Sequence, residues 1–342
     1  MAVKTVIGLD IGSTAVRASE TQRGKHGPGL ASFAWAALPP GAVQAGTIQD
    51  DQAVVGALKH LWSTTKFRSR QVIIGFNHRQ VVVRDLSVSN LPDKELRASL
   101  PFQVRQTLPL PVEQTLLDFH RLAEHGSGST VRGLVIAAPK DAVLTMVHTV
   151  ERAGLHVAGV DLASFALLRS TSRLDATVEA LVDIGAASTT VVVHVDGEPL
   201  IVRTIPRGGR EITESVAKRL EISPEDAETA KCDVGLGTGS PAPAAAAIGD
   251  AVRPLVNEIR SSFAYLTAAG QRTGVARLVL SGGGSLLSGL TELLTDHLGV
   301  EVVLADPIAR VRGTTPRPAL EALERSRAVA GVSIGLALGA TR

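Results

Sequence analysis

One short phrase occurs twice in this 342-residue chain and restricts its fold more than any other feature. The copies are residues 10–14 (DIGST) and residues 183–190 (DIGAASTT). Each follows an apolar run and precedes another β-rich run, which predicts a β-hairpin rather than a P-loop, where a helix follows the glycine turn. A single Asp-x-Gly after a strand is usually only a turn, because both residues suit turn backbones. Two copies in the same context indicate two related α/β halves with a nucleotide between them.

The two predicted hairpins carry the groups that a phosphate ligand and a divalent cation require. If they face each other across a cleft, their backbone N–H groups can cradle phosphates. Asp10 and Asp183, each at the end of a strand, would then hold a hydrated magnesium ion, since Mg²⁺ prefers oxygen ligands and keeps several waters.

Composition excludes several other classes of protein. Aromatic residues make up only 3% of the chain and the net charge is +2, which leaves little for base stacking or for attraction to nucleic acid. Cys232 is the only cysteine, so an intrachain disulfide and cysteine-based zinc or iron–sulfur sites are excluded. No apolar run approaches the roughly 20 residues of a membrane span. We therefore expect a cytoplasmic protein that reaches a membrane only through a partner.

The order of predicted strands and helices suggests two halves and an insertion. The first half is predicted to comprise residues 1–75, 156–175 and a C-terminal helix at 326–339, the inserted α/β subdomain residues 76–155, and the second half residues 176–325.

The sequence also predicts three local features: a helix, a surface loop and a strand-to-helix junction. A helix is predicted from Pro92 to about Thr107, kinked or split at Pro101. Residues 236–247, rich in Gly, Pro and Ala, are predicted to be a surface loop. A triple glycine is predicted to join a strand to a helix that ends near His297.

Four elements in this order resemble the actin-like ATPase superfamily, which includes actin, FtsA cell-division proteins, chaperone ATPases and sugar kinases. They are the two hairpins, the helix start at Gly208-Gly209 and the triple glycine at 282–284. The resemblance implies an α/β fold of duplicated actin-like (ribonuclease H-like) domains around a nucleotide cleft, with a small inserted FtsA-like α/β subdomain. It also implies ATP and magnesium as cofactors.

Carried over position by position, the resemblance implies a set of binding residues. For ATP they are Asp10, Gly12, Ser13, Thr14, Asp183, Gly185, Ala186, Thr189, Gly208, Gly209, Glu228, Lys231, Gly282, Gly283 and Gly284; for Mg²⁺, largely through water, they are Asp10 and Asp183. Glu228 and Lys231 lie one helical turn apart, which suits a contact with ribose and adenine and equally suits a surface ion pair.

A closer resemblance joins the whole chain to the PilM family of type IV pilus assembly. It rests on residues 91–96 (LPDKEL), 108–113 (LPLPVE), 135–140 (VIAAPK) and 207–213 (RGGREIT). This resemblance implies an ATP-binding cytoplasmic adaptor of the inner-membrane assembly platform that captures the cytoplasmic N-terminal tail of a PilN-like membrane protein. Residues 92–111 are the predicted groove. Other platform proteins, motor ATPases and a second copy of the chain are further candidate partners; nucleic acid is not.

Some residues depart from the superfamily pattern, and two other functions stay open. Ala186 and Ala187 stand where active ATPases often carry glycines, which predicts at most slow hydrolysis, and no side chain is identified as a general base. A sugar-type small-molecule kinase would need a catalytic Asp near a sugar hydroxyl. Asp118 and Asp161 lie in or near the inserted region, but neither is in a kinase-like motif. An FtsA-like filament-forming division protein would end in a basic amphipathic membrane helix, which the sequence LALGATR at 336–342 does not resemble.

Overall fold

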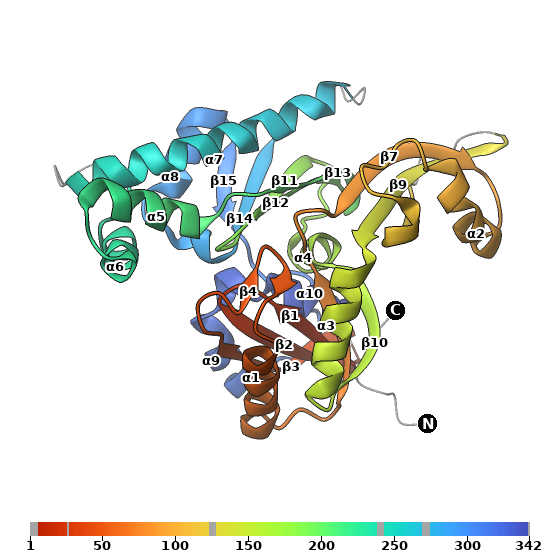
Figure 1. Cartoon of the computed structure of the whole chain (residues 1–342), viewed down its shortest axis with the longest axis horizontal. Coiled ribbons are helices and arrows are strands. Elements are labelled where there is room, and N and C mark those ends of the chain that lie inside the picture. The colour runs from red at the N-terminus through yellow and green to blue at the C-terminus, as the bar shows by residue number, and fades with distance from the viewer. Residues whose placement is uncertain (1–5, 26, 123–127, 238–242, 269–273, 341–342) are drawn as a thin grey trace.

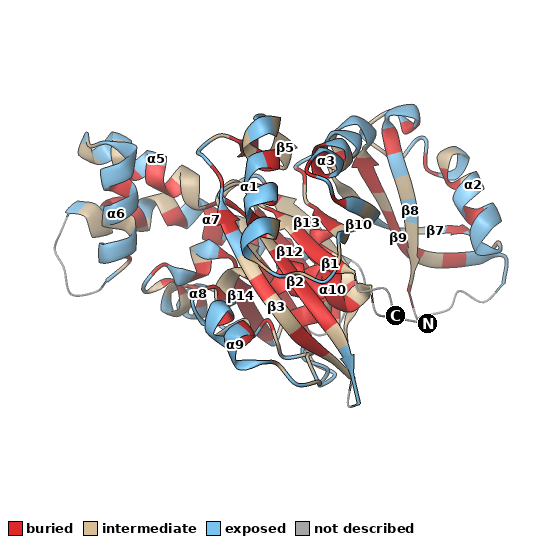
Figure 2. Ribbon diagram, turned by 90° about the horizontal axis from the view of Figure 1, so that it is seen from below, coloured by how far each residue is buried: buried red, intermediate tan, exposed pale blue. Residues whose placement is uncertain are grey.

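The chain folds into two α/β halves with a smaller sheet beside the first of them (Figure 1). The computed structural model describes residues 6–25, 27–122, 128–237, 243–268 and 274–340. Buried residues concentrate along the strands of both large sheets and on α10, whereas the outer surfaces of the peripheral helices are exposed (Figure 2).

The first large sheet has the strand order β10-β6-β1-β2-β3. β1 pairs antiparallel with β2 and parallel with β6; β3 lies antiparallel to β2, and β10 parallel to β6. The strands are β1 (Ile7–Ile11), β2 (Ala15–Gly24), β3 (Gly27–Ala37), β6 (Gln71–Phe76) and β10 (His156–Leu162). A two-stranded ribbon, β4 (Val43–Gln44) and β5 (Thr47–Ile48), follows β3.

The second large sheet, β13-β12-β11-β14-β15, repeats this arrangement. Its first three strands in chain order pair antiparallel, and the last two add in parallel on the other side of the first strand, as in the first sheet. The strands are β11 (Val178–Ile184), β12 (Thr189–Val195), β13 (Glu198–Ile205), β14 (Arg277–Ser281) and β15 (Glu301–Leu304). The duplicated phrase in the sequence therefore corresponds to a duplicated sheet topology.

Two helices, α4 (Ala163–Thr171) and α10 (Gly331–Gly339), join the halves. Leu336 of α10 packs in one apolar cluster with residues of α4 and with Leu181 of the second sheet. The backbones of the two helices touch, because a Cβ on Gly335 would lie 1.7 Å from the carbonyl oxygen of Ala166, so only glycine fits there. α10 is thus a core element between the sheets.

The remaining helices cover the outer faces of the sheets. α1 (Asp51–Thr64), whose N-cap Asp50 accepts from the Ala53 N–H, and α3 (Lys140–Arg152) pack into the first core, and α9 (Arg317–Glu324) packs beside β3. The second sheet is covered by α5 (Gly209–Leu220), α6 (Pro224–Val234), α7 (Pro243–Ala268) and α8 (Leu290–Leu298).

The inserted region forms a three-stranded sheet of order β7-β9-β8 with α2 packed on it (Figure 1). Its elements are β7 (Val82–Ser89), α2 (Asp93–Gln103), a 3₁₀ turn (Val112–Gln114), β8 (Thr115–Arg121) and β9 (Thr130–Pro139). Leu96 and Leu100 of α2 bury against Val131 and Val135 of β9. Because α3 packs into the first core instead, we propose that the separate subdomain ends near Pro139.

Three local predictions need correction. The helix predicted to reach about Thr107 ends at Gln103, because Pro101 removes a helical hydrogen bond in its last turn. The predicted loop 236–247 is wrong from Pro243 onward, where α7 begins with a proline and an alanine run, both favourable in a first turn; residues 238–242 lie outside the described residues.

The triple glycine does not lead directly into a long helix. A 3₁₀ turn covers Gly283–Leu286, and α8 begins only at Leu290, because Gly289 takes a left-handed conformation with φ +82° that interrupts the helix. Within the described ranges, no helix combines the length and the apolar character that crossing a bilayer requires.

Candidate functional site

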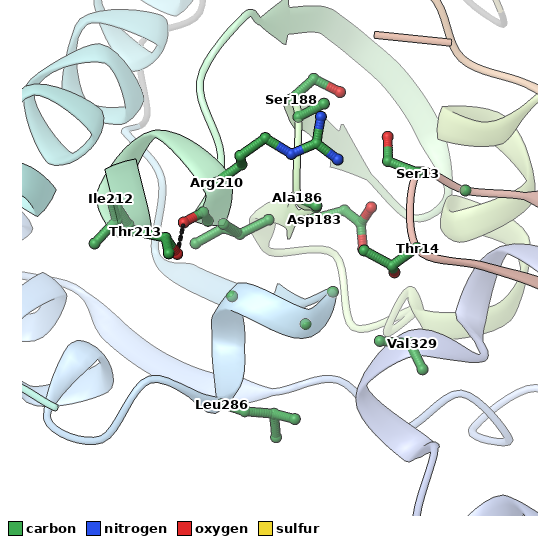
Figure 3. A pocket seen from close by; sticks show the side chains of 18 of the residues that line it. Ser13, Thr14, Asp183, Ala186, Ser188, Arg210, Ile212, Thr213, Leu286 and Val329 are labelled. Atoms are coloured by element: carbon green, nitrogen blue, oxygen red, sulfur yellow. Dashed lines mark hydrogen bonds between the residues drawn. The ribbon is translucent and has the colours of Figure 1, made fainter. Parts of the chain in front are cut away.

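A cavity of about 830 Å³ lies between the two halves, a volume suited to a nucleotide-sized ligand. Figure 3 shows the side chains that surround it. Of the predicted site residues, those that line it are Asp10, Gly12, Ser13, Thr14, Asp183, Gly185, Ala186, Gly209, Glu228, Lys231, Gly282, Gly283 and Gly284. Thr189 and Gly208 are absent from this lining. The structure thus brings residues from five separate segments to one cavity.

The two hairpins at the cavity are closed in the same way. The Gly12 N–H donates to the Ala15 carbonyl at 3.0 Å, and the Gly185 N–H donates to the Ser188 carbonyl at 3.0 Å. Each tip is a two-residue turn, residues 13–14 in the first and 186–187 in the second. The backbone N–H groups of these tips donate to no acceptor in the described parts of the chain. They are therefore available to an anion.

The two aspartates lie at the ends of the central strands of their sheets, and the charge of Asp10 affects Asp183. Burial raises the pKa of Asp10, against the opposing charge of Arg17, whose Nη1 lies 3.5 Å from Oδ2 of Asp10. Burial also raises the pKa of Asp183 to about 6; the charge of Asp10 adds to this, and a hydrogen bond with Ser281 opposes it. Two carboxylates crowded in this way would be stabilised by a cation between them.

The donor set limits the kind of metal site that is possible. Among the described residues, no group of three or more His, Cys, Asp or Glu side chains is arranged to hold a metal ion. Asp10 and Asp183 alone suit Mg²⁺, which typically binds one or two carboxylates together with water and substrate phosphates. The residues present therefore fit a magnesium–phosphate ligand and do not form a closed protein site.

Gly208 and Thr189 do not line the cavity but support the second hairpin. A Cβ on Gly208 would lie 2.4 Å from the Gly185 carbonyl oxygen, so this glycine allows the start of α5 to dock on the hairpin. The N–H groups of Gly209 and Arg210 donate to the carbonyls of Gly185 and Ala186, both at 2.9 Å. The first N–H groups of α5 are therefore committed to the hairpin tip, a detail that the sequence did not reveal.

Thr189 has a similar supporting position. Its side chain is fully buried, and its Oγ1 donates to the Arg207 carbonyl at 2.9 Å, which ties β12 to the segment that enters α5. Its hydroxyl is thus engaged away from the cavity.

Glu228 and Lys231 form an ion pair that lines the cavity, while their contact with ribose and adenine stays a prediction. Lys231 Nζ donates to Glu228 Oε2 at 2.6 Å, to Thr213 Oγ1 at 2.8 Å and to the Gly209 carbonyl at 3.2 Å. Burial opposes ionisation of Glu228, but the hydrogen bonds from Lys231 and Thr213 outweigh it and lower its pKa. The pair fastens α6 to the first turn of α5.

The triple glycine lies against the end of the strand that carries Asp183. Gly282 has φ +83°, and a Cβ there would lie 2.4 Å from the Ile184 carbonyl oxygen. A Cβ on Gly284 would lie 2.3 Å from Cγ2 of Ile184, whereas one on Gly283 would meet no atom within 4 Å. Gly282 and Gly284 thus permit close packing, and Gly283 leaves the cavity wall open.

Sequence reasoning missed several lining residues, among them Arg17, Asn77, Arg210, Cys232 and Leu286. Arg17 could have been predicted from the sequence, because a two-residue tip places position 17 opposite position 10 in the hairpin register. Cys232 follows Glu228 by one helical turn, which also gave a signal. Asn77, Arg210 and Leu286 carried no such spacing, since only the tertiary fold brings them to the cavity.

The two acids considered for a kinase lie elsewhere. Asp118 is exposed and pairs with Arg97 at 3.1 Å in the inserted region, and Asp161 pairs with Arg169 beside α4. Neither lines the cavity. Their positions therefore give the kinase alternative no catalytic acid at the cavity.

Comparisons with known proteins agree with this architecture. The family described as "Type IV pilus assembly protein PilM" matches residues 8–341. A chain of the solved PilM-PilN type IV pilus biogenesis complex is 29% identical, with a TM-score of 0.83 and coverage of 98% of each chain. The structure of MreB5 of Spiroplasma citri bound to ADP is 14% identical, with a TM-score of 0.55 and coverage of 95% of this chain and 97% of that one. These matches confirm the predicted actin-like α/β fold.

The chain is also similar to the cell division protein FtsA of Bacillus subtilis (strain 168). The identity is 26% over 228 residues, covering 58% of this chain and 51% of that relative. The chain spans about half the length of the curated relatives it matches.

Proposed function

Because the chain belongs to the PilM family of type IV pilus assembly proteins, we propose that it is an ATP-binding adaptor of the pilus assembly platform at the cytoplasmic face of the inner membrane. In this role it captures the cytoplasmic N-terminal tail of a PilN-like membrane protein. The observation that carries the proposal is the likeness, over 98% of both chains, to a protein solved in a PilM-PilN complex. Membrane attachment then runs through the partner.

The cavity supports the nucleotide half of this proposal. The free N–H groups of the two hairpin tips bind the phosphates, and Asp10 and Asp183 hold Mg²⁺ largely through water. When bound, the ion neutralises phosphate charge. Gly283 and Leu286 line the part of the cavity that accepts the adenosine. Hydrolysis is at most slow, because the Cβ atoms of Ala186 and Ala187 crowd the γ-phosphate where active ATPases often carry glycines.

The segment between β6 and β7 supports a link between the cavity and the inserted subdomain. Asn77 lines the cavity, and its Nδ2 donates to Thr190 Oγ1 of the second half at 3.3 Å. The next residue, His78, has Nε2 3.0 Å from Thr47 Oγ1, and β7 begins four residues later at Val82. Movement of the halves around a nucleotide would therefore be transmitted to the position of β7.

A thiol-labelling experiment tests whether the cavity takes a nucleotide. Cys232 is the only cysteine in the sequence, is exposed and lines the cavity. Saturating Mg–ATP is expected to slow its alkylation by a maleimide at pH 8 by about 5-fold or more, because the ligand blocks access to the thiol. The rate is followed by intact-protein mass spectrometry.

Two controls define this result. Cys232→Ser should show no labelling, and unfolded protein should be labelled equally fast with and without Mg–ATP. An unchanged labelling rate in the folded protein at millimolar Mg–ATP would contradict nucleotide binding next to α6.

The inserted subdomain supplies the proposed peptide site. Phe102 on α2 is 82% exposed and lies within the predicted groove segment 92–111, so its ring is available to a partner. Phe102→Ser is expected to weaken binding of the PilN-like tail by about 10-fold, which corresponds to about 1.4 kcal/mol, and to leave Mg–ATP affinity unchanged. Titration calorimetry with each ligand measures both effects.

The matched control is Leu304→Ser, because Leu304 is also exposed but belongs to β15 of the second half. This variant should bind tail and nucleotide like the wild type. Equal tail affinity for Phe102→Ser and wild type would exclude Phe102 from the peptide site.

A further inference from the structure

Arg210 holds a distinctive position in the wall of the cavity. It is the second residue of α5, and its backbone N–H donates to the Ala186 carbonyl at 2.9 Å. Its main chain is thereby fixed to the tip of the second hairpin. Figure 3 shows its side chain extending from α5 into the space bordered by Ser188, Asp183 and the first hairpin at Ser13.

The other two cations of the cavity wall are already engaged. Arg17 lies 3.5 Å from Asp10, and Lys231 is held by Glu228, Thr213 and the Gly209 carbonyl. The guanidinium group of Arg210 has no hydrogen bond or ion pair to any residue in the described ranges. A half-buried guanidinium without a protein partner is well suited to an anionic ligand.

The cavity also has two chemically different ends. Arg210, Ser13, Ser188 and Asp183 gather at one end, whereas Leu286 lies at the other, as Figure 3 shows. A nucleotide places its apolar base and its last phosphate at opposite ends of the molecule. The base therefore belongs at the end of Leu286, and the last phosphate at the end of Arg210.

We infer that Arg210 contacts the terminal phosphate of a bound nucleoside triphosphate and makes the site prefer the triphosphate to the diphosphate. The inference rests on the proposed nucleotide function and assigns to one side chain the discrimination between the two ligands. An arginine suits this task because its planar fork can donate two hydrogen bonds to one phosphate. Since α5 is docked on the second hairpin, this contact would also tie α5 to the phosphate held between the halves.

The test compares the affinities of Mg–ATP and Mg–ADP by titration calorimetry. Arg210→Gln is expected to lower ATP affinity by about 10-fold or more, because the variant loses a charge-assisted bidentate contact; 10-fold corresponds to about 1.4 kcal/mol. ADP affinity should change by less than about 3-fold, since ADP lacks the group that Arg210 contacts. Arg210→Lys keeps the charge without the fork and should fall between the two.

Arg207→Gln is the matched control, because Arg207 lies three residues earlier, pairs with Glu211 and is absent from the cavity lining. It should leave the ratio of the two affinities unchanged. An unchanged ratio in Arg210→Gln, or equal losses for ATP and ADP, would overturn the inference. Thermal melting checks the fold; if Arg210→Gln does not fold, an unchanged ratio in Arg210→Lys overturns it instead.

This outcome is distinct from failure of the proposed function. If the wild-type protein binds neither ATP nor ADP, nucleotide binding itself is contradicted. If wild type binds both and only the ratio fails to respond to Arg210, the nucleotide site stands and the role of Arg210 does not.

Discussion

Replacing Asp183 with asparagine is expected to lower Mg–ATP affinity by about 100-fold or more and to make the nucleotide-free protein more stable at alkaline pH. The loss of affinity follows from the loss of one of the two carboxylates that face the proposed Mg²⁺, and 100-fold corresponds to about 3 kcal/mol. The gain in stability follows because burial and the charge of Asp10 disfavour the ionised form of Asp183 in the folded protein.

The pH dependence of the stability gain has a defined sign. The pKa of Asp183 in the folded protein is about 6, above its ordinary value of 3.8, so ionisation destabilises the fold. This destabilisation is absent below about pH 4, grows as the pH rises from about 4 to about 6, and is complete above about pH 6. Asparagine removes it, so the variant should be more stable by about 3 kcal/mol at pH 8, with about two thirds of the difference gone at pH 4.5.

Urea denaturation at both pH values measures the stability, and calorimetry measures the affinity. The matched control is Asp118→Asn, since Asp118 is exposed and lies outside the cavity; it should show neither effect. Wild-type Mg–ATP affinity in Asp183→Asn would contradict the assigned magnesium position, and a stability difference independent of pH would contradict the buried, crowded state of this carboxylate.

Replacing Gly282 with alanine is expected to destabilise the second half by about 3 kcal/mol or more, whereas the same change at the adjacent Gly283 should cost less than about 0.5 kcal/mol. Gly282 combines φ +83° and ψ 167°, a region that only glycine adopts readily, with a Cβ position 2.4 Å from the Ile184 carbonyl oxygen. Gly283 has open space at its Cβ position.

Chemical denaturation of the two variants measures this contrast, with each serving as the control for the other. Gly283→Ala should remain folded and still bind nucleotide, more weakly if its methyl group enters the ligand's space. Equal stability of Gly282→Ala and wild type would show that the turn is free to rearrange. It would contradict the close approach of Gly282 to Ile184.

Much of the fold could be predicted from the sequence, because the same sequence pattern occurs in both halves. The repeated strand–acid–turn–strand pattern identified both hairpins, and the strand order of the two sheets repeats in the same way. The pattern placed Asp10 and Asp183 at strand ends before tight turns, and Ser13, Thr14 and Ala186 of the two tips were predicted together with them.

Other features depended on tertiary contacts that no local pattern encodes. Thr189 was predicted to bind phosphate and Gly208 to direct a helix N-terminus toward the nucleotide. In the structure Gly208 allows α5 to dock on the second hairpin, and Thr189 of β12 donates to the Arg207 carbonyl. Arg210 lies next to Gly209 in the RGGREIT segment, but the sequence did not single it out, because its importance arises from the direction of its side chain and from the engagement of Arg17 and Lys231 by other groups. A sequence alone does not show whether a charged side chain is free or already paired with another group.

The measurement that tests the central claim most directly is calorimetric titration of the protein with the cytoplasmic N-terminal peptide of its PilN-like partner, with and without saturating Mg–ATP. We predict micromolar or tighter binding of the peptide to the ATP-loaded protein, and weaker binding when the nucleotide is removed. No binding to the ATP-loaded protein would contradict the adaptor function.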